Sequence, residues 1–343
     1  MTNAVLFSEP YYRDVVAEHG YTTLDLDQFG FALAGLDPAT LNARYLCHHQ
    51  GERFAATPVE RRAVTTGFGM SGAPHMATVS HILKMVELQR GGETCQIVLG
   101  DLDAYNGKAR TFSRVTELAT QFREYAVRLG FDPRRGTLRT QVGHLPTLES
   151  MYLLARYVDQ SDFDAAEEAN HSYYASRGLV DDTMTFRRSM SLALMAADFI
   201  VLGQEHDAVL VLLGLDEHKY VRFAQEARQR IDPDAPLRAD FSLSAVYTRM
   251  VNGFGGHPKF SKSVAGSSID VDTPSIQVRR LLQDEPLLPE ASVTYQLMCQ
   301  LPRYDADRLS VLHGHCLEGG PRWQREVDEL ADYLTSLIDL WPR

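Results

Sequence analysis

The pattern of hydrophobic positions changes at about residue 60. Residues 1–60 mix apolar and polar positions irregularly, with turn signals at Gly20 and Gly30, and predict an appended N-terminal segment with a few short helices. From Arg61 onward, short apolar runs alternate with amphipathic stretches, which is typical of strands followed by helices. We therefore expect an α/β domain to begin at about residue 61.

Three apolar runs indicate the strands of this domain. They cover 63–66, 96–99 and 207–213, and the last is apolar at almost every position, as expected of a parallel strand buried on both faces. Helices are predicted over about 75–90, 113–130 and 219–231, through most of 145–202, and after residue 272. The expected architecture is a parallel α/β sheet with helices on both faces and a helical C-terminal part.

Composition and charge narrow the class of protein. Of the 343 residues, 44% are hydrophobic and 23% are charged, which is typical of a globular chain. No apolar stretch approaches the ~20 residues that span a bilayer, and the N-terminus lacks a signal-peptide pattern, so we expect a cytoplasmic protein with no membrane partner. The net charge of -11 argues against a general nucleic-acid coating protein but leaves room for a local basic track.

Cysteine and histidine positions predict neither a disulfide framework nor a metal site. The four cysteines lie far apart, without a CxxC pair. Two groups, at 47–49 and 313–316, combine cysteine with histidine, but their members are adjacent or nearly so, whereas structural zinc sites use separated ligand pairs. We therefore expect no metal ion held by protein ligands.

Glycines and one histidine are concentrated in TTGFGMSGAPHMAT, residues 65–78, between the first predicted strand and the first helix. Such a turn lets backbone N–H groups approach a phosphate, and the helix N-terminus that follows favours negative charge. His75 adds a hydrogen-bonding ring at the helix start. Taken alone, a glycine turn of this kind is more often a simple connection between strand and helix.

A cationic segment, HPKFSKS, occupies residues 257–263 in a glycine-rich loop. Lys259 and Lys262 stand three residues apart with a hydroxyl side chain between them. Such a pair can hold a polyphosphate more tightly as charge builds on the leaving pyrophosphate. Taken alone, most loops of lysine and serine are ordinary surface.

The two segments together resemble the HIGH and KMSKS signatures of class I aminoacyl-tRNA synthetases. The helix ending in KMVELQRGG, the segment IVLGDLDAY, the run LMAAD at 194–198 and GLDEHK at 214–219 are similar to the tryptophanyl and tyrosyl branch. The order and spacing agree over about residues 60–275. The resemblance implies a Rossmann-like (HUP-type) catalytic domain at 61–270, with a helical insertion at about 145–200, and a C-terminal helical domain at 271–343.

The resemblance also implies activation of an amino acid by ATP as its adenylate, with Mg²⁺ accompanying the ATP. The substrate carboxylate attacks the α-phosphorus, so the protein supplies alignment and charge stabilisation rather than a nucleophile. The catalytic residues implied are His75, Lys259, Lys262 and Ser263. The residues implied to bind ATP are Gly67, Phe68, Gly69, Ser71, Gly72, Thr78, Gly214, Asp216 and Ser261.

Five residues are expected to contact the amino acid. Asp198 matches the position that reads the polar tip of the aromatic side chain in this branch, and Met195 lies on the same predicted helix. Thr65 lies where many members contact the ring, whereas Asp101 and Tyr105 follow a strand at the edge where ligands bind. A buried carboxylate that accepts an indole N–H or a phenol O–H would contribute ~1.5–3 kcal/mol and penalise a ring without a donor.

Departures from the family pattern keep alternatives open. Ala77 replaces a glycine of the HIGH signature, Met70 replaces a proline, and the tail after Ser263 is short. We expect an enzyme that charges tRNA with tryptophan or a close aromatic analogue, and by analogy a homodimer through the 145–200 helices. The alternatives are a stand-alone ligase that passes the aminoacyl group to a small-molecule acceptor in specialised metabolism, and a non-catalytic paralogue that binds ATP or an amino acid.

Overall fold

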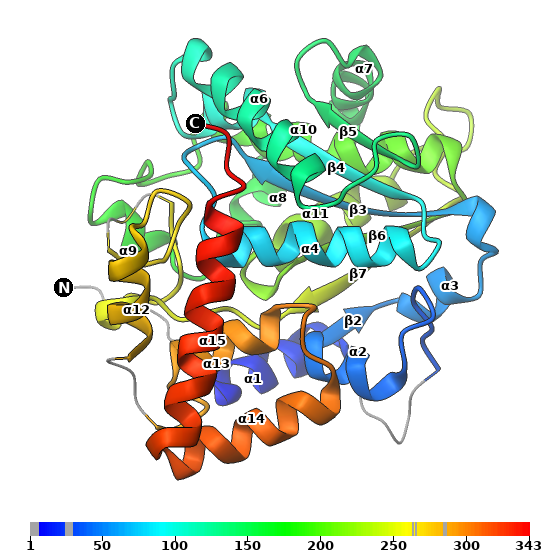
Figure 1. Cartoon of the computed structure of the whole chain (residues 1–343). Coiled ribbons are helices and arrows are strands. Elements are labelled where there is room, and N and C mark those ends of the chain that lie inside the picture. Colours follow the sequence, from blue (N-terminus) through cyan, green and yellow to red (C-terminus); the bar gives the residue numbers. More distant parts are fainter. Residues whose placement is uncertain (1–6, 25–29, 263, 265, 284–286) are drawn as a thin grey trace.

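A sheet of seven strands runs through the computed structural model, which describes residues 7–24, 30–262, 264, 266–283 and 287–343 (Figure 1). Its order is β1-β2-β7-β6-β3-β4-β5. The five strands from β7 to β5 are parallel, and β1 and β2 are antiparallel. The bounds are β1 Thr22–Thr23, β2 Cys47–His49, β3 Arg62–Gly69, β4 Cys95–Gly100, β5 Gly136–Thr140, β6 Ala208–Gly214 and β7 Ser242–Thr248.

Strand β6 shows why the sheet lies at the centre of the molecule. Every one of its residues is buried. Leu210 and Leu212 belong to one hydrophobic core, whereas Val209, Val211 and Leu213 belong to the other. Because successive side chains of a strand point to opposite faces, this strand has to be apolar at both sets of positions. The prediction of a parallel sheet covered on both faces is confirmed.

Helices cover both faces of the sheet (Figure 1). Residues of α4, α6 and the C-terminal helices share one core, and residues of α1, α10 and α11 share the other. The α-helices are α1 Glu9–His19, α2 Pro38–Arg44, α3 Gly51–Ala55, α4 Met76–Arg90, α5 Asp101–Gly107, α6 Phe112–Arg128, α7 Leu145–Leu154, α8 Gln160–Ala165, α9 His171–Ala175, α10 Phe186–Glu205, α11 His218–Gln229, α12 Ser275–Gln283, α13 Val293–Gln300, α14 Ala306–Glu318 and α15 Gly320–Ile338.

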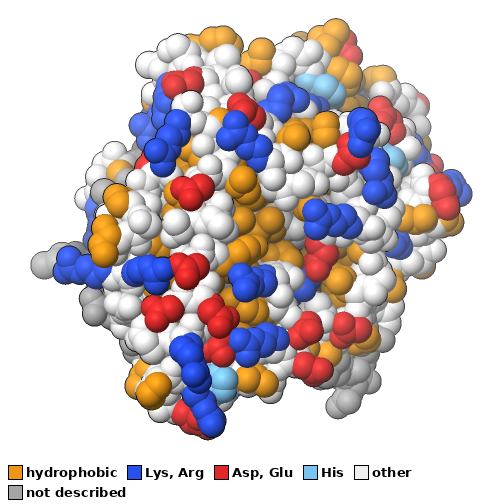
Figure 2. All heavy atoms as spheres, viewed as in Figure 1, with side chains coloured by type: hydrophobic (Ala, Val, Ile, Leu, Met, Phe, Trp, Pro, Cys, Tyr) orange, Lys and Arg blue, Asp and Glu red, His pale blue; other side chains and the backbone are white. Residues whose placement is uncertain are grey.

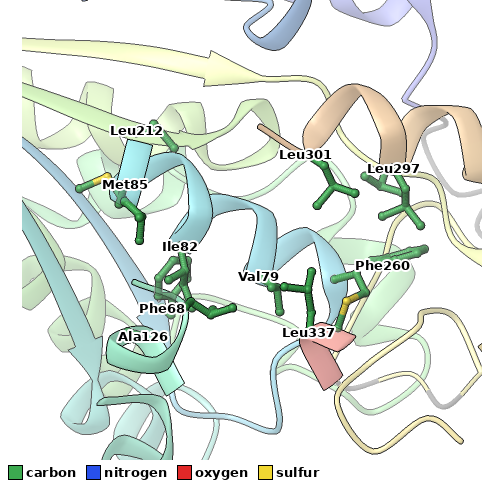
Figure 3. Close-up of a cluster of buried hydrophobic side chains, with 14 of the residues drawn as sticks. Phe68, Val79, Ile82, Met85, Ala126, Leu212, Phe260, Leu297, Leu301 and Leu337 are labelled. Atoms are coloured by element: carbon green, nitrogen blue, oxygen red, sulfur yellow. The ribbon is translucent and has the colours of Figure 1, made fainter. Parts of the chain in front are cut away.

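Helix α4 is packed between the sheet and the C-terminal helices. Figure 3 shows Val79 and Ile82 of α4 among side chains that come from the strands and from α13 and α15. Both are fully buried. Full burial of an aliphatic side chain contributes ~1.5–3 kcal/mol, so α4 holds the end of the glycine segment against a rigid support.

Two parts of the sheet were not predicted. The helices expected in the first 60 residues are present, but this segment also supplies β1 and β2, and β2 pairs with β7 at Cys47 and Tyr247. Strands β5 and β7 were also missed, because their sequences, GTLRT and SLSAVYT, mix polar residues with few apolar ones. The first glycines of the 65–78 segment are part of β3 rather than of a turn.

Charged side chains of both signs are interspersed over the face shown in Figure 2, without a single broad basic surface on that face. No helix among the described residues is long and apolar enough to cross a membrane.

Candidate active site

A cavity of about 380 Å³ lies at the carboxyl ends of the parallel strands. The last residues of β3, β4, β6 and β7, which are Gly69, Gly100, Gly214 and Thr248, all line it. Open α/β sheets bind their ligands at this edge. The cavity is therefore the candidate active site.

His75 is the N-cap of α4 and lines the cavity. Its Nδ1 accepts a hydrogen bond from the Thr78 backbone N–H at 3.2 Å, which leaves Nε2 to carry the ring proton. Burial, together with the positive charges of Lys262 and Lys259, lowers the pKa of His75 to about 3. The ring is therefore neutral at physiological pH and offers one N–H donor.

Backbone hydrogen bonds join the glycine segment to the chain that follows the lysine segment. The Met76 N–H donates to the Ile269 carbonyl at 2.8 Å, and the Val271 N–H donates to the Pro74 carbonyl at 3.2 Å. Both segments line the same cavity. The fold therefore brings these two distant stretches of sequence together.

Lys262 reaches back to the glycine segment. Its Nζ donates to the Gly69 carbonyl at 3.1 Å and lies 5.2 Å from the centre of the Phe122 ring. Burial lowers the pKa of Lys262 to about 8, although the carboxylates of Glu217 and Asp103 oppose this shift. A partly desolvated ammonium group of this kind interacts strongly with an incoming anion.

Lys259 is held between two carboxylates. Its Nζ forms an ion pair with Asp216, and Glu168 Oε2 lies 3.6 Å away. Glu168 in turn accepts a hydrogen bond from the Tyr220 hydroxyl at 2.5 Å. Burial alone would lower the pKa of Lys259, but Asp216 and Glu168 raise it well above its ordinary value. Lys259 is therefore charged, and a phosphate has to compete with these carboxylates for it.

Gly214 and Asp216 lie together at the end of β6. A Cβ atom added to Gly214 would stand 2.7 Å from Oδ1 of Asp216 and 2.8 Å from the sulfur of Met250. Real Cβ atoms do not come so close, so any other residue at position 214 would displace the side chains of Asp216 and Met250. The backbone here can approach a ligand closely while the Asp216 carboxylate stays within reach of a hydroxyl.

Asp198 lines the cavity beside β5, with β4 and β3 between it and β6 in the sheet, and three donors engage its carboxylate. It accepts hydrogen bonds from Arg139 Nη2 at 2.7 Å, Gln141 Nε2 at 2.7 Å and Thr147 Oγ1 at 3.1 Å. Burial raises the pKa of Asp198, and the Arg139 charge opposes that shift. The sequence predicted a carboxylate that accepts a hydrogen bond from the ring of a substrate. The structure shows that this carboxylate also forms an ion pair with Arg139.

Most of the predicted site residues line this one cavity. They are Gly67, Phe68, Gly69, Ser71, His75, Thr78, Met195, Asp198, Gly214, Asp216, Lys259, Ser261 and Lys262. Ser263 lies outside the described residues. Their roles in binding and catalysis stay predictions.

Four predicted residues do not line the cavity among the described residues. Thr65 is buried and accepts a hydrogen bond from Gln96, and Gly72 packs beside Lys262. Asp101 instead accepts the backbone N–H groups of its neighbours at Leu102, Gln141 and Val142. Tyr105 is 46% exposed and packs edge-on against Phe112. The predicted roles of these four residues in binding stay predictions as well.

Sequence reasoning missed Arg139, Gln141, Glu168 and Tyr220. Arg139 lies on β5, which was not predicted, and Gln141 follows it directly. Glu168 ends an acidic run at 162–168, and acidic side chains at such spacing more often form a solvated helix face. Each of these residues gains its importance from partners far away in sequence, so no local signal could have identified it.

The paired segments at one end of a parallel sheet define a catalytic domain of the class I synthetase type. A family model described as tRNA synthetases class I (W and Y) matches residues 58–301, and the chain belongs to this family. It is therefore a ligase of the aromatic aminoacyl-tRNA synthetases, as predicted.

Two curated relatives match this chain over similar shares of both sequences. The tyrosine--tRNA ligase of Archaeoglobus fulgidus is 24% identical over 249 residues, which is 71% of this chain and 70% of the relative. The tyrosine--tRNA ligase of Methanococcus maripaludis is 23% identical over 257 residues, with the same two shares.

Solved structures share the fold. Tryptophanyl-tRNA synthetase from Aeropyrum pernix K1 has a TM-score of 0.77 at 18% identity, covering 97% of this chain and 94% of that chain. Tyrosyl-tRNA synthetase from Archaeoglobus fulgidus complexed with L-tyrosine has a TM-score of 0.66 at 19% identity, covering 84% and 91%. At such identities the likeness concerns the fold alone.

Proposed function

We propose that this chain activates an aromatic amino acid with ATP as its adenylate and transfers the aminoacyl group to tRNA. The observation that carries the proposal is the cavity itself. His75, Lys259 and Lys262 line its part beside β3 and β6, which we call the first end, and Asp198 lines its part beside β5, which we call the second end. Such a cavity can hold a nucleotide and a ring-bearing amino acid at once, with the reacting groups in between.

The residues at the first end fit ATP. Lys259, Lys262 and the Nε2–H of His75 offer donors to the phosphates, and the Asp216 carboxylate can accept a ribose hydroxyl beside the close backbone of Gly214. The substrate ATP supplies the α-phosphorus that the amino-acid carboxylate attacks, and Mg²⁺ is expected to arrive with the phosphates. The lysines then stabilise the charge that develops on the leaving pyrophosphate.

The residues at the second end fit an aromatic side chain. Asp198 can accept a donor from the ring, and Met195, which lines the cavity on the same helix, offers an apolar and polarisable surface. We propose tryptophan or a close analogue as the amino acid, because the indole N–H is such a donor. A phenol O–H could serve as well, so tyrosine belongs in every assay.

A homodimer is the proposed assembly. Two large apolar side chains, Tyr152 of α7 and Phe186 at the start of α10, are each 81% exposed, and Leu145 of α7 is 59% exposed. Helices α7 and α10 pack on each other, so a second copy could cover this surface. Tyr152→Glu should shift the mass in sedimentation toward the monomer, and an unchanged mass would contradict this interface.

Amino-acid-dependent exchange of pyrophosphate into ATP tests the proposed function. We expect exchange with one aromatic amino acid and, with total tRNA present, charging of one tRNA species. The proposal fails if none of the standard amino acids supports exchange. Exchange without charging would instead favour a small-molecule acceptor.

A further inference from the structure

Arg139 and Asp198 form a buried ion pair at the amino-acid end of the cavity. Their charged atoms lie 2.7 Å apart, and the two side chains are 10% and 4% exposed. Asp198 lines the cavity, whereas Arg139 is not among the residues that line it. Arg139 therefore acts on a bound molecule through Asp198 rather than by direct contact.

Neighbouring strands hold Arg139 in place. Its Nε donates to Oε1 of Gln96 on β4 at 3.2 Å, and Nε2 of Gln96 donates to Oγ1 of Thr65 on β3 at 3.2 Å. A guanidinium group offers its donors in a rigid fork. With Nε bonded to Gln96 of β4 and Nη2 bonded to Asp198 of α10, the guanidinium of Arg139 has a fixed orientation.

Two further donors orient the carboxylate of Asp198. Gln141 Nε2 donates to Oδ2, and the other end of the same amide accepts the Asp103 backbone N–H at 3.0 Å, which fixes the direction of the amide. Thr147 Oγ1 donates to Oδ1, as does Arg139. Because a carboxylate has about four acceptor positions, these three donors leave one position, on Oδ2.

We propose that Arg139 sets the amino-acid selectivity of the enzyme by holding Asp198 ionised and oriented, so that the site takes a neutral aromatic side chain that carries a single N–H or O–H donor. The inference rests on the proposed function and deepens it. Arg139 is a positioning residue, since it acts through Asp198. A ring without a donor would leave the last acceptor position of a buried carboxylate unfilled, which is costly.

The charges around Asp198 explain why its ionisation needs Arg139. Burial raises the pKa of Asp198 and Arg139 opposes this shift. Among the described residues, Asp103 of α5, which disfavours the charge of Asp198, and His144 before α7 also face it. Thr147 spends its only proton on Asp198, so Nδ1 of His144 must donate to Thr147 at 2.9 Å. Burial, together with Arg139, lowers the pKa of His144, so in the wild type the guanidinium is the positive charge that faces Asp198.

Without Arg139, protonation of Asp198 would change the chemistry of the pocket. A protonated carboxyl group carries a donor of its own and has less acceptor capacity. Its O–H would then face the N–H or O–H of an indole or phenol, so that two donors meet. The pocket would bind a plain phenyl ring more readily. Raising the pH would ionise Asp198 again and restore the preference.

The test compares Arg139→Met with Arg62→Met, which removes a similarly buried arginine from its pair with Glu93 at the amino end of β3. The readout is kcat/KM for the preferred aromatic amino acid divided by that for phenylalanine, in pyrophosphate exchange at several pH values. We expect Arg139→Met to lower this ratio by roughly tenfold or more, with recovery toward alkaline pH and an unchanged KM for ATP. Arg62→Met should leave the ratio as it is.

Arg139→Lys covers the case in which Arg139→Met does not fold. It keeps a charge near Asp198 but loses the fork, so the ratio should fall while its pH dependence stays that of the wild type. An unchanged ratio in the folded variants, or an equal fall in the Arg62→Met control, would overturn the inference.

Calorimetric titration keeps this inference separable from the proposed function. Tryptophan, tyrosine and phenylalanine are titrated into the wild type and into Arg139→Met without ATP. Selective binding that is lost in the variant supports the role of Arg139 even if the wild type shows no exchange. If the wild type shows exchange but the variant keeps its binding selectivity, the proposed role of Arg139 is wrong and the proposed function stands.

Discussion

The two ends of the cavity use buried charge in opposite ways. At the nucleotide end, Lys259 is shared between Asp216 and Glu168, and Lys262 donates to the backbone carbonyl of Gly69. At the amino-acid end, Asp198 accepts from Arg139 and two neutral donors. The cations of the first end have partners that a phosphate can replace, whereas the ion pair of the second end belongs to the framework.

This difference corresponds to the two tasks of the site. Charge develops on the phosphates during activation, so the groups that stabilise it must be free to follow it. Selectivity requires the opposite, because a carboxylate that could turn or take up a proton would accept the wrong ring. We therefore propose that the buried lysines serve the reaction and that the buried arginine serves recognition.

The largest effect should come from Lys262→Ala. Loss of one preorganised charge at the leaving group lowers the rate of the chemical step by a factor of ~10²–10³. ATP binding should weaken by less than roughly tenfold, because Lys259 remains. Single-turnover activation and ATP titration measure the two quantities. Lys219→Ala, which changes a lysine on α11 that does not line the cavity, is the matched control. Equal losses of rate and binding would contradict the role in the transition state.

The next largest effect should be a difference in the free energy of unfolding between variants of the two ends. Asp198→Ala leaves Arg139 buried without its carboxylate and should lower the free energy of unfolding by ~3–5 kcal/mol. Asp216→Ala should cost less than ~2 kcal/mol, since Lys259 keeps Glu168. Urea unfolding of both variants gives the comparison. A larger loss for Asp216→Ala would mean that the nucleotide end, and not the amino-acid end, is the structural pair.

The pH dependence should come from the nucleotide end. The pKa of Lys262 is lowered to about 8 by burial, and a lysine is charged below its pKa and neutral above it. We therefore expect kcat/KM for ATP to fall as pH rises through about 8. Glu217, whose pKa burial and Asp216 raise to about 8, gains a negative charge over the same interval and adds to the fall.

Two variants separate these contributions. Lys262→Arg should move the alkaline limb upward, because a guanidinium stays charged, and Glu217→Gln should make the limb shallower. If neither variant changes the pH profile of kcat/KM, the fall at alkaline pH belongs to a group outside this end of the cavity.

The smallest effect is expected for Glu168→Gln. It removes one of the carboxylates that compete with phosphate for Lys259, while Asp216 remains. The KM for ATP should fall by about twofold to fivefold, since a partly exposed ion pair is worth little. Tyr220→Phe, which removes only the hydrogen bond to Glu168, should change KM less. A rise in KM would show that Glu168 positions Lys259 rather than competing for it.

Sequence patterns predicted the central part of the fold and not its edges. β6 and α4 carry enough apolar residues in regular order to be recognised, because each is buried along its length. β1, β2 and β5 are short and only partly apolar, and each is defined by hydrogen bonds to a strand far away in sequence. Such pairings have no local signature.

The same contrast applies to the site. His75, Lys259 and Lys262 could be identified because each lies in a compact segment whose composition suits phosphate. The partners of these residues could not, since Glu168 reaches Lys259 only after the chain has folded. Arg139 lies on a strand that was not predicted and acts on Asp198 from 59 positions away. Networks of this kind become visible only in the folded molecule.

A crystal structure with ATP and the amino acid that supports exchange would locate both substrates in the cavity. We expect the triphosphate between His75 and the two lysines, and the aromatic ring with its donor on Oδ2 of Asp198. A nucleotide bound elsewhere, or a ring that points away from Asp198, would contradict it.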